Sequence, residues 1–494
     1  MWPFKQRREP SIGKWDLRQE LLRLSSCEGF TIGDSVEGVL ITGATGAGKS
    51  TGSGALLARS YLAAGYGGLV LTAKPDERAQ WETYCRETGR SDDLIIFSPG
   101  NPYRFNFMDF ELTRQGEGAG LTENLVNLFA EVQQIAERQS GQGGREEEGY
   151  WRRTNRQICR NLVDLLVMAT GRISIPDLYR LVVSAPVSLN QVQSEDWKQR
   201  SFCFACLEAA DGRALSPIQR HDLAVVTDYW LLEFPGLSDK TRSVIVSTFT
   251  SMVDVLNRGI LAELFCGGTN VTPEATEEGA ILLIDLPVKT YAEVGQFAQV
   301  LWKFAFQRSI ERRNIAESPR PVFLWADEAQ FTTTAYDMQF QTTCRSARVA
   351  TVLLTQNVSN FYAALGGNEK GKAQVDSLFA NLNTKIWHAN SDPVTNEWAA
   401  SIIGRSRQYL TNSSSSYEPQ DWLAVATGIN MACQNSSGVT ETFEFEVQPR
   451  QFTTLRKGGP ANHWLIDGIV FQGGRRFQAT GRTWMPVVFS QRNQ

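Results

Sequence analysis

Short apolar runs alternate with helix-like segments over the first part of the chain. The runs are "EGVLITG" (37–43), "GGLVLTA" (67–73) and "DLIIFSPG" (93–100). Between them lie "KSTGSGALLARSYLAAG" (49–65) and "PDERAQWETYCRETG" (75–89), whose patterns favour helices. Continuous apolar strands separated by helices are typical of a parallel sheet that is covered on both faces. The pattern therefore predicts an α/β fold with helices on both faces of a parallel sheet.

From about residue 112 the apolar residues follow a spacing of three and four. "LTENLVNLFAEVQQIAER" (121–138) and "YWRRTNRQICRNLVDLLVMATG" (150–171) both show this helical period. Strand-like runs return at "GAILLIDLP" (279–287). We therefore expect one sheet domain that is split by an inserted all-α domain. The expected division is an N-terminal segment at 1–34, a sheet domain at 35–111 and 250–494, and the inserted helices at 112–249.

Three further strand-like runs follow, "PVFLWADEAQ" (321–330), "VATVLLTQN" (349–357) and "NTKIWHAN" (383–390). The next segment, 405–440, begins with the Ser-rich "RSRQYLTNSSSSYEPQ" and is expected to be a mobile loop of the sheet domain. Near the end, "HWLIDGIVFQGGRRFQATG" (463–481) predicts a β-hairpin that turns at its Gly-Gly pair.

A glycine-rich segment lies between the first apolar run and the first helix. It reads Gly43-Ala44-Thr45-Gly46-Ala47-Gly48-Lys49-Ser50, which fits G-x-x-x-x-G-K-[ST] throughout, and Thr51 continues it. In such a loop the backbone N–H groups surround phosphates. The lysine meets the β- and γ-phosphates and the hydroxyl binds magnesium. We therefore expect a nucleoside triphosphate and Mg²⁺ here; the strand–loop–helix context disfavours the alternative of a glycine-rich turn without a ligand.

A phosphate loop of this kind needs a carboxylate for its metal ion, and two strands end on one. "VFLWADEAQ" offers Asp327 for the metal and Glu328 to polarise the attacking water. Asp285 ends the other strand, but Leu and Pro follow it, so no base stands beside it. Consecutive Asp and Glu residues, far along the chain from Lys49, favour a motor-type ATPase over a compact kinase or GTPase.

Gln356 ends the apolar strand that follows the Asp-Glu strand in sequence. In a parallel sheet this places its amide at the carboxyl edge, where it can sense the γ-phosphate or orient water. Arg345 and Arg348 precede the same strand and so lie towards its other end. We expect Arg345 to act as an arginine finger on a neighbouring subunit, with Arg348 as the alternative. Either arginine could also be an ordinary surface residue.

Composition narrows the class of protein only slightly. The chain has 494 residues and a net charge of −4, which argues mildly against coating of nucleic acid but not against a motor. Cys203 and Cys206 lack a second Cys or His pair nearby, so helical core positions are favoured over zinc. The histidines, His221, His388 and His463, are far apart in sequence and are expected to be structural.

Scattered cysteines together with a nucleotide site favour a reducing cytoplasm, and the hydropathy pattern predicts no membrane span. No run of 18 uncharged apolar residues occurs, and charges interrupt the N-terminal segment. Trp2 and Phe4 stand beside basic residues and could touch a membrane surface, although a frayed terminus is favoured. We therefore expect contact with the inner membrane to be peripheral at most.

These motifs, in this order, resemble the coupling ATPases of conjugation and type IV secretion, within the FtsK–HerA group of ring-shaped DNA motors. The resemblance spans about residues 35–405. Its elements are the phosphate loop, "LVLTAKPDE", "FSPGNPYRFNFMD", "VFLWADEAQ", "CRSARVATVLLTQN" and "NTKIWHANSDPVTNEWAASIIG". It implies a RecA-like P-loop NTPase fold, ATP with Mg²⁺, a homo-hexamer, and DNA, relaxase or secretion-channel partners. Two departures are the lack of the family's usual two N-terminal transmembrane helices and of the usual Asp before Pro in "AKPDE".

The leading hypothesis is an ATP-driven hexameric DNA translocase, serving conjugation or a cytosolic role in mobile-element maintenance or defence. A second hypothesis is a recruitment module, in which ATP sets the oligomeric state and the helical insert binds a relaxase or protein substrate. A nucleotide-dependent enzyme acting on small molecules is the third, and no second group of catalytic residues supports it.

Overall fold

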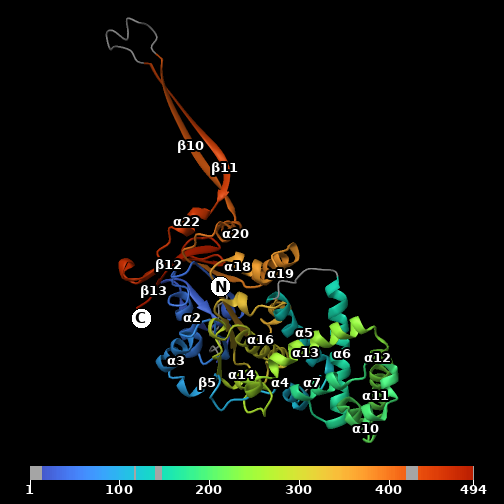
Figure 1. The fold of residues 1–494 in the computed structure, drawn as a ribbon. Coiled ribbons are helices and arrows are strands. Elements are labelled where there is room, and N and C mark those ends of the chain that lie inside the picture. Colours follow the sequence, from blue (N-terminus) through green and yellow to red (C-terminus); the bar gives the residue numbers. More distant parts are fainter. Residues whose placement is uncertain (1–13, 116–117, 140–146, 419–431, 493–494) are drawn as a thin grey trace, which may run out of the picture.

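A computed structural model describes residues 14–115, 118–139, 147–418 and 432–492 (Figure 1). Its centre is a nine-stranded sheet with the order β13-β12-β9-β3-β8-β7-β4-β6-β5. The seven strands from β9 to β5 are parallel, whereas β12 and β13 are antiparallel. The strands are β3 (Val39–Thr42), β4 (Gly67–Leu71), β5 (Leu94–Phe97), β6 (Ile281–Ile284), β7 (Val322–Ala326), β8 (Val349–Thr355), β9 (Thr384–Trp387), β12 (Leu465–Gln472) and β13 (Trp484–Ser490).

Successive residues of each strand point to opposite faces, and both faces are buried. In β3, Val39 and Ile41 belong to one hydrophobic cluster and Leu40 to another. The first cluster includes α2 (Ser53–Ala63), α3 (Glu77–Glu87) and the small hairpin of β1 (Glu20–Arg23) and β2 (Gly29–Thr31). The second includes α16 (Val288–Arg312). The expected α/β class, with helices on both faces, is confirmed.

The helical segment lies to one side of the sheet (Figure 1). Among the described residues, none of 112–249 contributes a strand to the central sheet. One continuous hydrophobic cluster joins sheet residues such as Leu282 to Leu125, Ile158 and Phe249 of the insert. The insert therefore shares a core with one face of the sheet. Its helices are α5 (Thr122–Gln139), α6 (Glu147–Thr170), α7 (Ile175–Ser184), α8 (Leu189–Val192), α9 (Glu195–Arg200), α10 (Phe202–Asp211), α11 (Pro217–Asp228), α12 (Phe234–Gly236) and α13 (Asp239–Leu256).

The remaining helices complete the layers around the sheet. They are α1 (Ile32–Val36), α4 (Phe107–Thr113), α14 (Gly259–Phe265), α15 (Ala275–Glu278), α17 (Ala335–Thr343), α18 (Val358–Ala364), α19 (Glu369–Ala380), α20 (Pro393–Ile403) and α22 (Pro449–Thr453). Of the helices in the described ranges, no single one has the length and apolar character of a membrane span. Only α13 and α14 together, bent by 76°, pass that test. Trp2 and Phe4 lie outside the described residues.

The Ser-rich segment at 405–440 differs from the loop that we expected. It contains β10 (Arg405–Glu418) and β11 (Ala432–Phe445), which pair antiparallel from Arg405–Phe445 to Glu418–Ala432. This hairpin projects from the rest of the molecule (Figure 1), and residues 419–431 lie outside the described ranges. A hairpin that buries neither face needs no alternation of apolar and polar residues, so the usual strand signal is missing from its sequence.

The C-terminal hairpin is present, but its second strand differs from the prediction. The first strand, β12, was expected, whereas its partner β13 begins only at Trp484. The intervening residues contact Glu28 instead: Arg475 Nη2 donates to Glu28 Oε2 at 2.8 Å, and the Gln478 amide donates to Glu28 Oε1. These contacts hold residues after the Gly473-Gly474 turn against the N-terminal hairpin, so the second strand does not follow that turn directly.

Candidate nucleotide site

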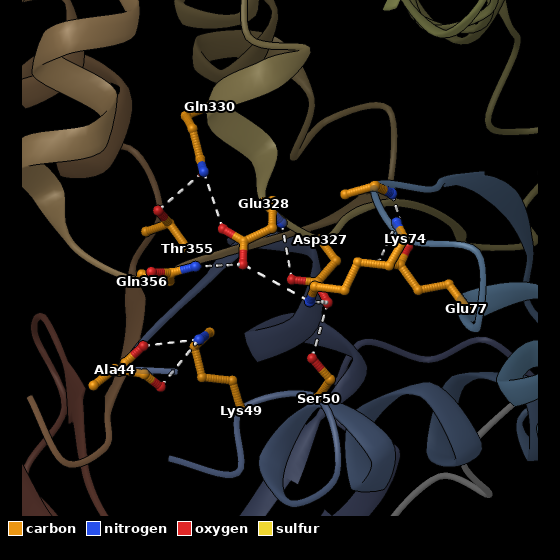
Figure 2. A network of polar contacts seen from close by, with 12 residues as sticks. Ala44, Lys49, Ser50, Lys74, Glu77, Asp327, Glu328, Gln330, Thr355 and Gln356 are labelled. Atoms are coloured by element: carbon orange, nitrogen blue, oxygen red, sulfur yellow. Dashed lines mark hydrogen bonds and ion pairs between the residues drawn. The ribbon is translucent and has the colours of Figure 1, made fainter. Parts of the chain in front are cut away.

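The phosphate loop connects β3 to α2 at the carboxyl edge of the sheet. Gly46 and Gly48 have φ values of 73° and 85°, a left-handed conformation that glycine adopts without strain. Helix α2 begins at Ser53, so residues 49–52 form turns rather than the first helical turn that we expected. Lys49 Nζ donates to the carbonyl oxygens of Gly43 at 2.8 Å and Ala44 at 3.4 Å (Figure 2). Burial lowers the pKa of Lys49, although the Glu328 and Asp327 carboxylates oppose this effect.

The structure brings Ser50 and Asp327 together. Ser50 Oγ donates to Asp327 Oδ2 at 2.9 Å, across 277 residues of sequence. The order β3-β8-β7 places the strand of Asp327 two positions from the phosphate-loop strand. Asp285 follows β6, two positions farther away, and accepts from Arg78 Nη1 at 3.0 Å. Asp327 therefore lies beside the phosphate loop, whereas Asp285 does not.

Glu328 has both carboxylate oxygens engaged by side-chain amides. Gln356 Nε2 donates to Oε1 at 3.0 Å, and Gln330 Nε2 donates to Oε2 at 3.0 Å (Figure 2). Thr355 Oγ1 in turn donates to Gln330 Oε1 at 3.0 Å. Glu328 is 4% exposed and takes the left-handed conformation at φ 45°, which is uncommon for a residue other than glycine. A carboxylate held in this way can orient and polarise one water molecule.

Two residues of the site, Lys74 and Glu77, were missing from the sequence prediction. Lys74 Nζ lies 3.4 Å from Asp327 Oδ2 and 3.8 Å from Glu328 Oε1. Burial lowers the pKa of Lys74, but the surrounding carboxylates outweigh it and the pKa is raised. Burial and the Asp327 carboxylate raise the pKa of Glu77 to about 8. The polar "KPDE" directly after an apolar strand was a usable signal, but only the adjacency of β4 and β7 shows its meaning.

His388, which we expected to be structural, contacts the helix that follows the phosphate loop. It is fully buried: Nε2 lies 2.7 Å from Ser53 Oγ, and Nδ1 lies 2.9 Å from the Asp467 carbonyl oxygen. Because a carbonyl only accepts, Nδ1 carries the proton and Nε2 accepts from Ser53. Burial lowers the pKa of His388 to about 4, so the ring is neutral at pH 7. His388 therefore joins β9, α2 and β12 beside the loop.

The two candidate finger arginines lie at the other end of the sheet. Arg345 is 69% exposed in its side chain, and its Nη2 lies 2.9 Å from Oε1 of Glu37, which precedes β3. Strand β8 separates Arg345 from Gln356, and its seven residues span roughly 20 Å. Arg348 Nη1 donates to the carbonyl oxygens of Trp15 at 3.0 Å and Pro319 at 2.9 Å. Arg348 therefore tethers loops at that end and does not reach the phosphate loop.

The donor set of the site is oxygen only. A serine hydroxyl and carboxylates are hard ligands of the type that Mg²⁺ prefers, with substrate phosphate and water completing its shell. Ser50 and Asp327 therefore fit magnesium. Within the described residues, no three His, Cys, Asp or Glu side chains form a group that could hold a metal ion by themselves. Cys203 and Cys206 are buried on α10, as the core interpretation predicted.

Residues 321–442, from the start of β7 into β11, match a family model described as the TraM recognition site of TraD and TraG. This range holds Asp327, Glu328, Gln330 and Gln356. No curated protein sequence matches the chain significantly.

The solved structures extend the comparison to the whole fold. An unbound bacterial conjugative coupling protein, TrwBdeltaN70, superposes with a TM-score of 0.60 over 99% of this chain and 91% of its own, at 16% identity. The fold is that of the conjugative coupling protein TrwB. The coupling protein TrwB with ADP and Mg²⁺ gives a TM-score of 0.59 at 16% identity, covering 98% and 92% of the two chains. TrwB with the ATP analogue ADPNP gives 0.57 at 16% identity, covering 93% and 88%. The expected resemblance to the coupling proteins is thus confirmed at the level of the fold, an α/β sheet domain with an all-α insert.

Proposed function

We propose that this chain is an ATP-hydrolysing, ring-forming DNA translocase of the coupling-protein type. One observation carries the proposal: Ser50, Asp327, Glu328 and Gln356 form a continuous hydrogen-bonded and ion-paired network around Lys74 at the edge of the phosphate loop (Figure 2). Coupling protein TrwB, which has this fold, is known with an ATP analogue and with ADP and Mg²⁺. These ligands support ATP and Mg²⁺ as the ligands of this chain.

The proposed roles follow from where each side chain points. Lys49 would exchange the carbonyls of Gly43 and Ala44 for the β- and γ-phosphates, and the loop N–H groups of residues 43–51 would surround them. Ser50 and Asp327 would hold the magnesium ion, which supplies positive charge to the phosphates. Glu328 would accept a proton from the attacking water. Gln356 would keep that carboxylate in position by its hydrogen bond and would sense whether a γ-phosphate is bound.

The partners in this proposal are DNA, a relaxase or secretion-channel protein, and further copies of the chain in a hexamer. Any membrane contact would be peripheral, from the cytoplasmic side. A recruitment module is the second candidate, because the matched family model is named for recognition of TraM and reaches into the projecting hairpin. A cytosolic motor in mobile-element maintenance or defence would use the same site.

The nucleotide site is tested by two substitutions with different effects. Lys49→Ala should abolish ATP hydrolysis, because it removes the charge that meets the phosphates. Glu328→Gln should keep ATP binding but lower turnover by about 10²–10⁴-fold, the usual contribution of a general base. Binding of a fluorescent ATP analogue and steady-state phosphate release measure the two steps. Equal turnover in wild type and Glu328→Gln would refute the assignment.

A further inference from the structure

Lys74 belongs to the network but was not among the site residues predicted from the sequence. It follows β4, which lies next to the strand of Asp327 and Glu328. Its ammonium lies within 4 Å of both carboxylates, while its side chain remains 40% exposed. The Lys74 ammonium therefore pairs with two buried carboxylates, while the rest of its side chain is open to solvent on one side.

The two carboxylates need a counter-charge. Asp327 is 8% exposed and Glu328 is 4% exposed, and buried anions are unfavourable unless cations or hydrogen bonds compensate them. Glu328 accepts hydrogen bonds from two side-chain amides. Asp327 accepts from the Ser50 hydroxyl and from the backbone N–H of Glu328, the latter at 2.8 Å. None of these donors is a cation. Lys49 points to loop carbonyls instead. Lys74 is thus the ammonium that directly pairs with these carboxylates.

The backbone of Lys74 is held in place by hydrogen bonds to Glu77, although its side chain is partly exposed. Glu77 Oε2 accepts from the Ala73 N–H at 2.9 Å, and Oε1 accepts from the Lys74 N–H at 3.2 Å. Glu77 is itself 5% exposed at the start of α3. These hydrogen bonds fix the turn from β4 to α3 and the backbone of Lys74. The ammonium can therefore change position only through rotations within the Lys74 side chain.

Ser50 Oγ and Lys74 Nζ converge on the same atom, Asp327 Oδ2. Neighbouring oxygen ligands of an octahedral magnesium ion, each at about 2.0–2.1 Å from it, lie about 2.9 Å from one another. Ser50 Oγ and Asp327 Oδ2 already have this spacing, at 2.9 Å. A metal ion bound to these two oxygens would compete with the Lys74 ammonium, which lies 3.4 Å from the same Asp327 oxygen. The dication would then supply the charge that Lys74 supplies in this structure.

We infer that Lys74 is an internal counter-cation that neutralises Asp327 and Glu328 in the nucleotide-free site and yields Asp327 to the divalent metal that arrives with the nucleotide. This inference rests on the proposed nucleotide site. It makes Lys74 a positioning residue, which acts through the two carboxylates. Lys74 and the metal then substitute for one another. Loss of Lys74 should therefore lower nucleotide affinity only when the metal is absent.

The test is the dissociation constant of a fluorescent ADP analogue, measured in EDTA and in saturating Mg²⁺. Lys74→Met should weaken binding in EDTA, because the β-phosphate then approaches two carboxylates that have lost their counter-cation. Binding in Mg²⁺ should be unchanged. The dissociation constant in EDTA divided by that in Mg²⁺ should therefore be about tenfold larger for Lys74→Met than for wild type, within the usual range of coupling between sites. Lys74→Arg, which keeps the charge, should leave the ratio near the wild-type value.

Lys289→Met is the matched control, because Lys289 is an exposed lysine of α16 whose ammonium lies 5.0 Å from the Phe331 ring centroid. It should leave the ratio unchanged. An equal loss of affinity in both media for Lys74→Met would show that Lys74 contacts the nucleotide or supports the fold, and no loss in either would show that it is an ordinary surface lysine. Both results overturn the inference. Absence of nucleotide binding by the wild-type chain would refute the proposed function instead.

Discussion

At the scale of single residues, the site is built from side chains at the carboxyl ends of the sheet's strands. Ser50 could be selected from sequence by the phosphate-loop pattern. Asp327, Glu328 and Gln356 could be selected because each lies at or just beyond the end of an apolar run, and parallel strands place such ends together. Lys74 satisfies the same rule, but the strand order that brings β4 beside β7 cannot be read from the sequence.

His388 predicts a dependence of stability on acid. Its pKa is about 4 in the folded chain and about 6.5 when unfolded, so the unfolded state takes up a proton first as the pH falls. Stability should therefore decrease between about pH 6.5 and pH 4, by up to about 3 kcal/mol from this residue. Thermal unfolding followed across this range should show a smaller pH dependence in His388→Gln than in wild type.

The matched control for that experiment is His221→Gln, at an exposed position of α11. It should keep the wild-type pH dependence. If His388→Gln also keeps it, proton uptake by His388 is not the cause of the acid sensitivity.

At the scale of elements, the antiparallel pair β12–β13 packs against the phosphate loop. A Cβ added at Gly48 would lie 2.2 Å from Ile466 Cδ1, and one at Gly52 would lie 2.7 Å from it. Gln491 Nε2, just after β13, donates to Thr51 Oγ1 at 2.8 Å. The phosphate loop therefore needs its glycines for close packing against β12 as well as for phosphate.

Packing of β12 against the loop predicts that substitutions at Gly48 and Ile466 are coupled. Gly48→Ala should lower the thermal midpoint, because alanine meets Ile466 and is strained at φ 85°. Ile466→Ala should also lower it by creating a cavity. The double substitution should lose less than the sum of the two, since the shortened side chain makes room for the new methyl group. Additive losses would mean that backbone strain alone makes Gly48 intolerant.

Elements that carry a buried face were easier to predict than those that do not. The parallel strands and the long helices of the insert have the apolar period of their class, and both were expected. The β10–β11 hairpin has Tyr409, Val439 and Phe443 exposed, at 62%, 65% and 58%, so no buried pattern marks its strands. The strand that pairs with β12 was predicted too early in the sequence, because the segment before it is hydrogen-bonded to Glu28, more than 440 residues away.

At the scale of the whole molecule, the nucleotide site lies at the carboxyl ends of the parallel strands and Arg345 lies at their amino ends. Arg345 forms an exposed ion pair with Glu37, and such pairs contribute little to stability, so it is available to another subunit. Arg348 is engaged with two backbone carbonyls and is the weaker choice. A ring of identical subunits could bring Arg345 of one chain to the phosphate loop of the next.

This arrangement predicts complementation between inactive chains. Arg345→Ala should retain ATP binding but lose turnover, since a finger supplied in trans contributes about 10³–10⁵ in rate. A mixture of Arg345→Ala and Lys49→Ala chains should regain activity, because some interfaces combine an intact loop with an intact arginine. A mixture without activity, or a wild-type rate per chain that does not change with dilution, would rule out sharing through Arg345.

The most direct test of the central claim is the steady-state ATP turnover of the wild-type chain with and without DNA, at a protein concentration that allows assembly. Glu328→Gln measured in parallel defines the background. A translocase couples hydrolysis to its track, so single- or double-stranded DNA should raise turnover clearly above the DNA-free rate. Turnover that is the same with and without both kinds of DNA would contradict the account and favour a recruitment module.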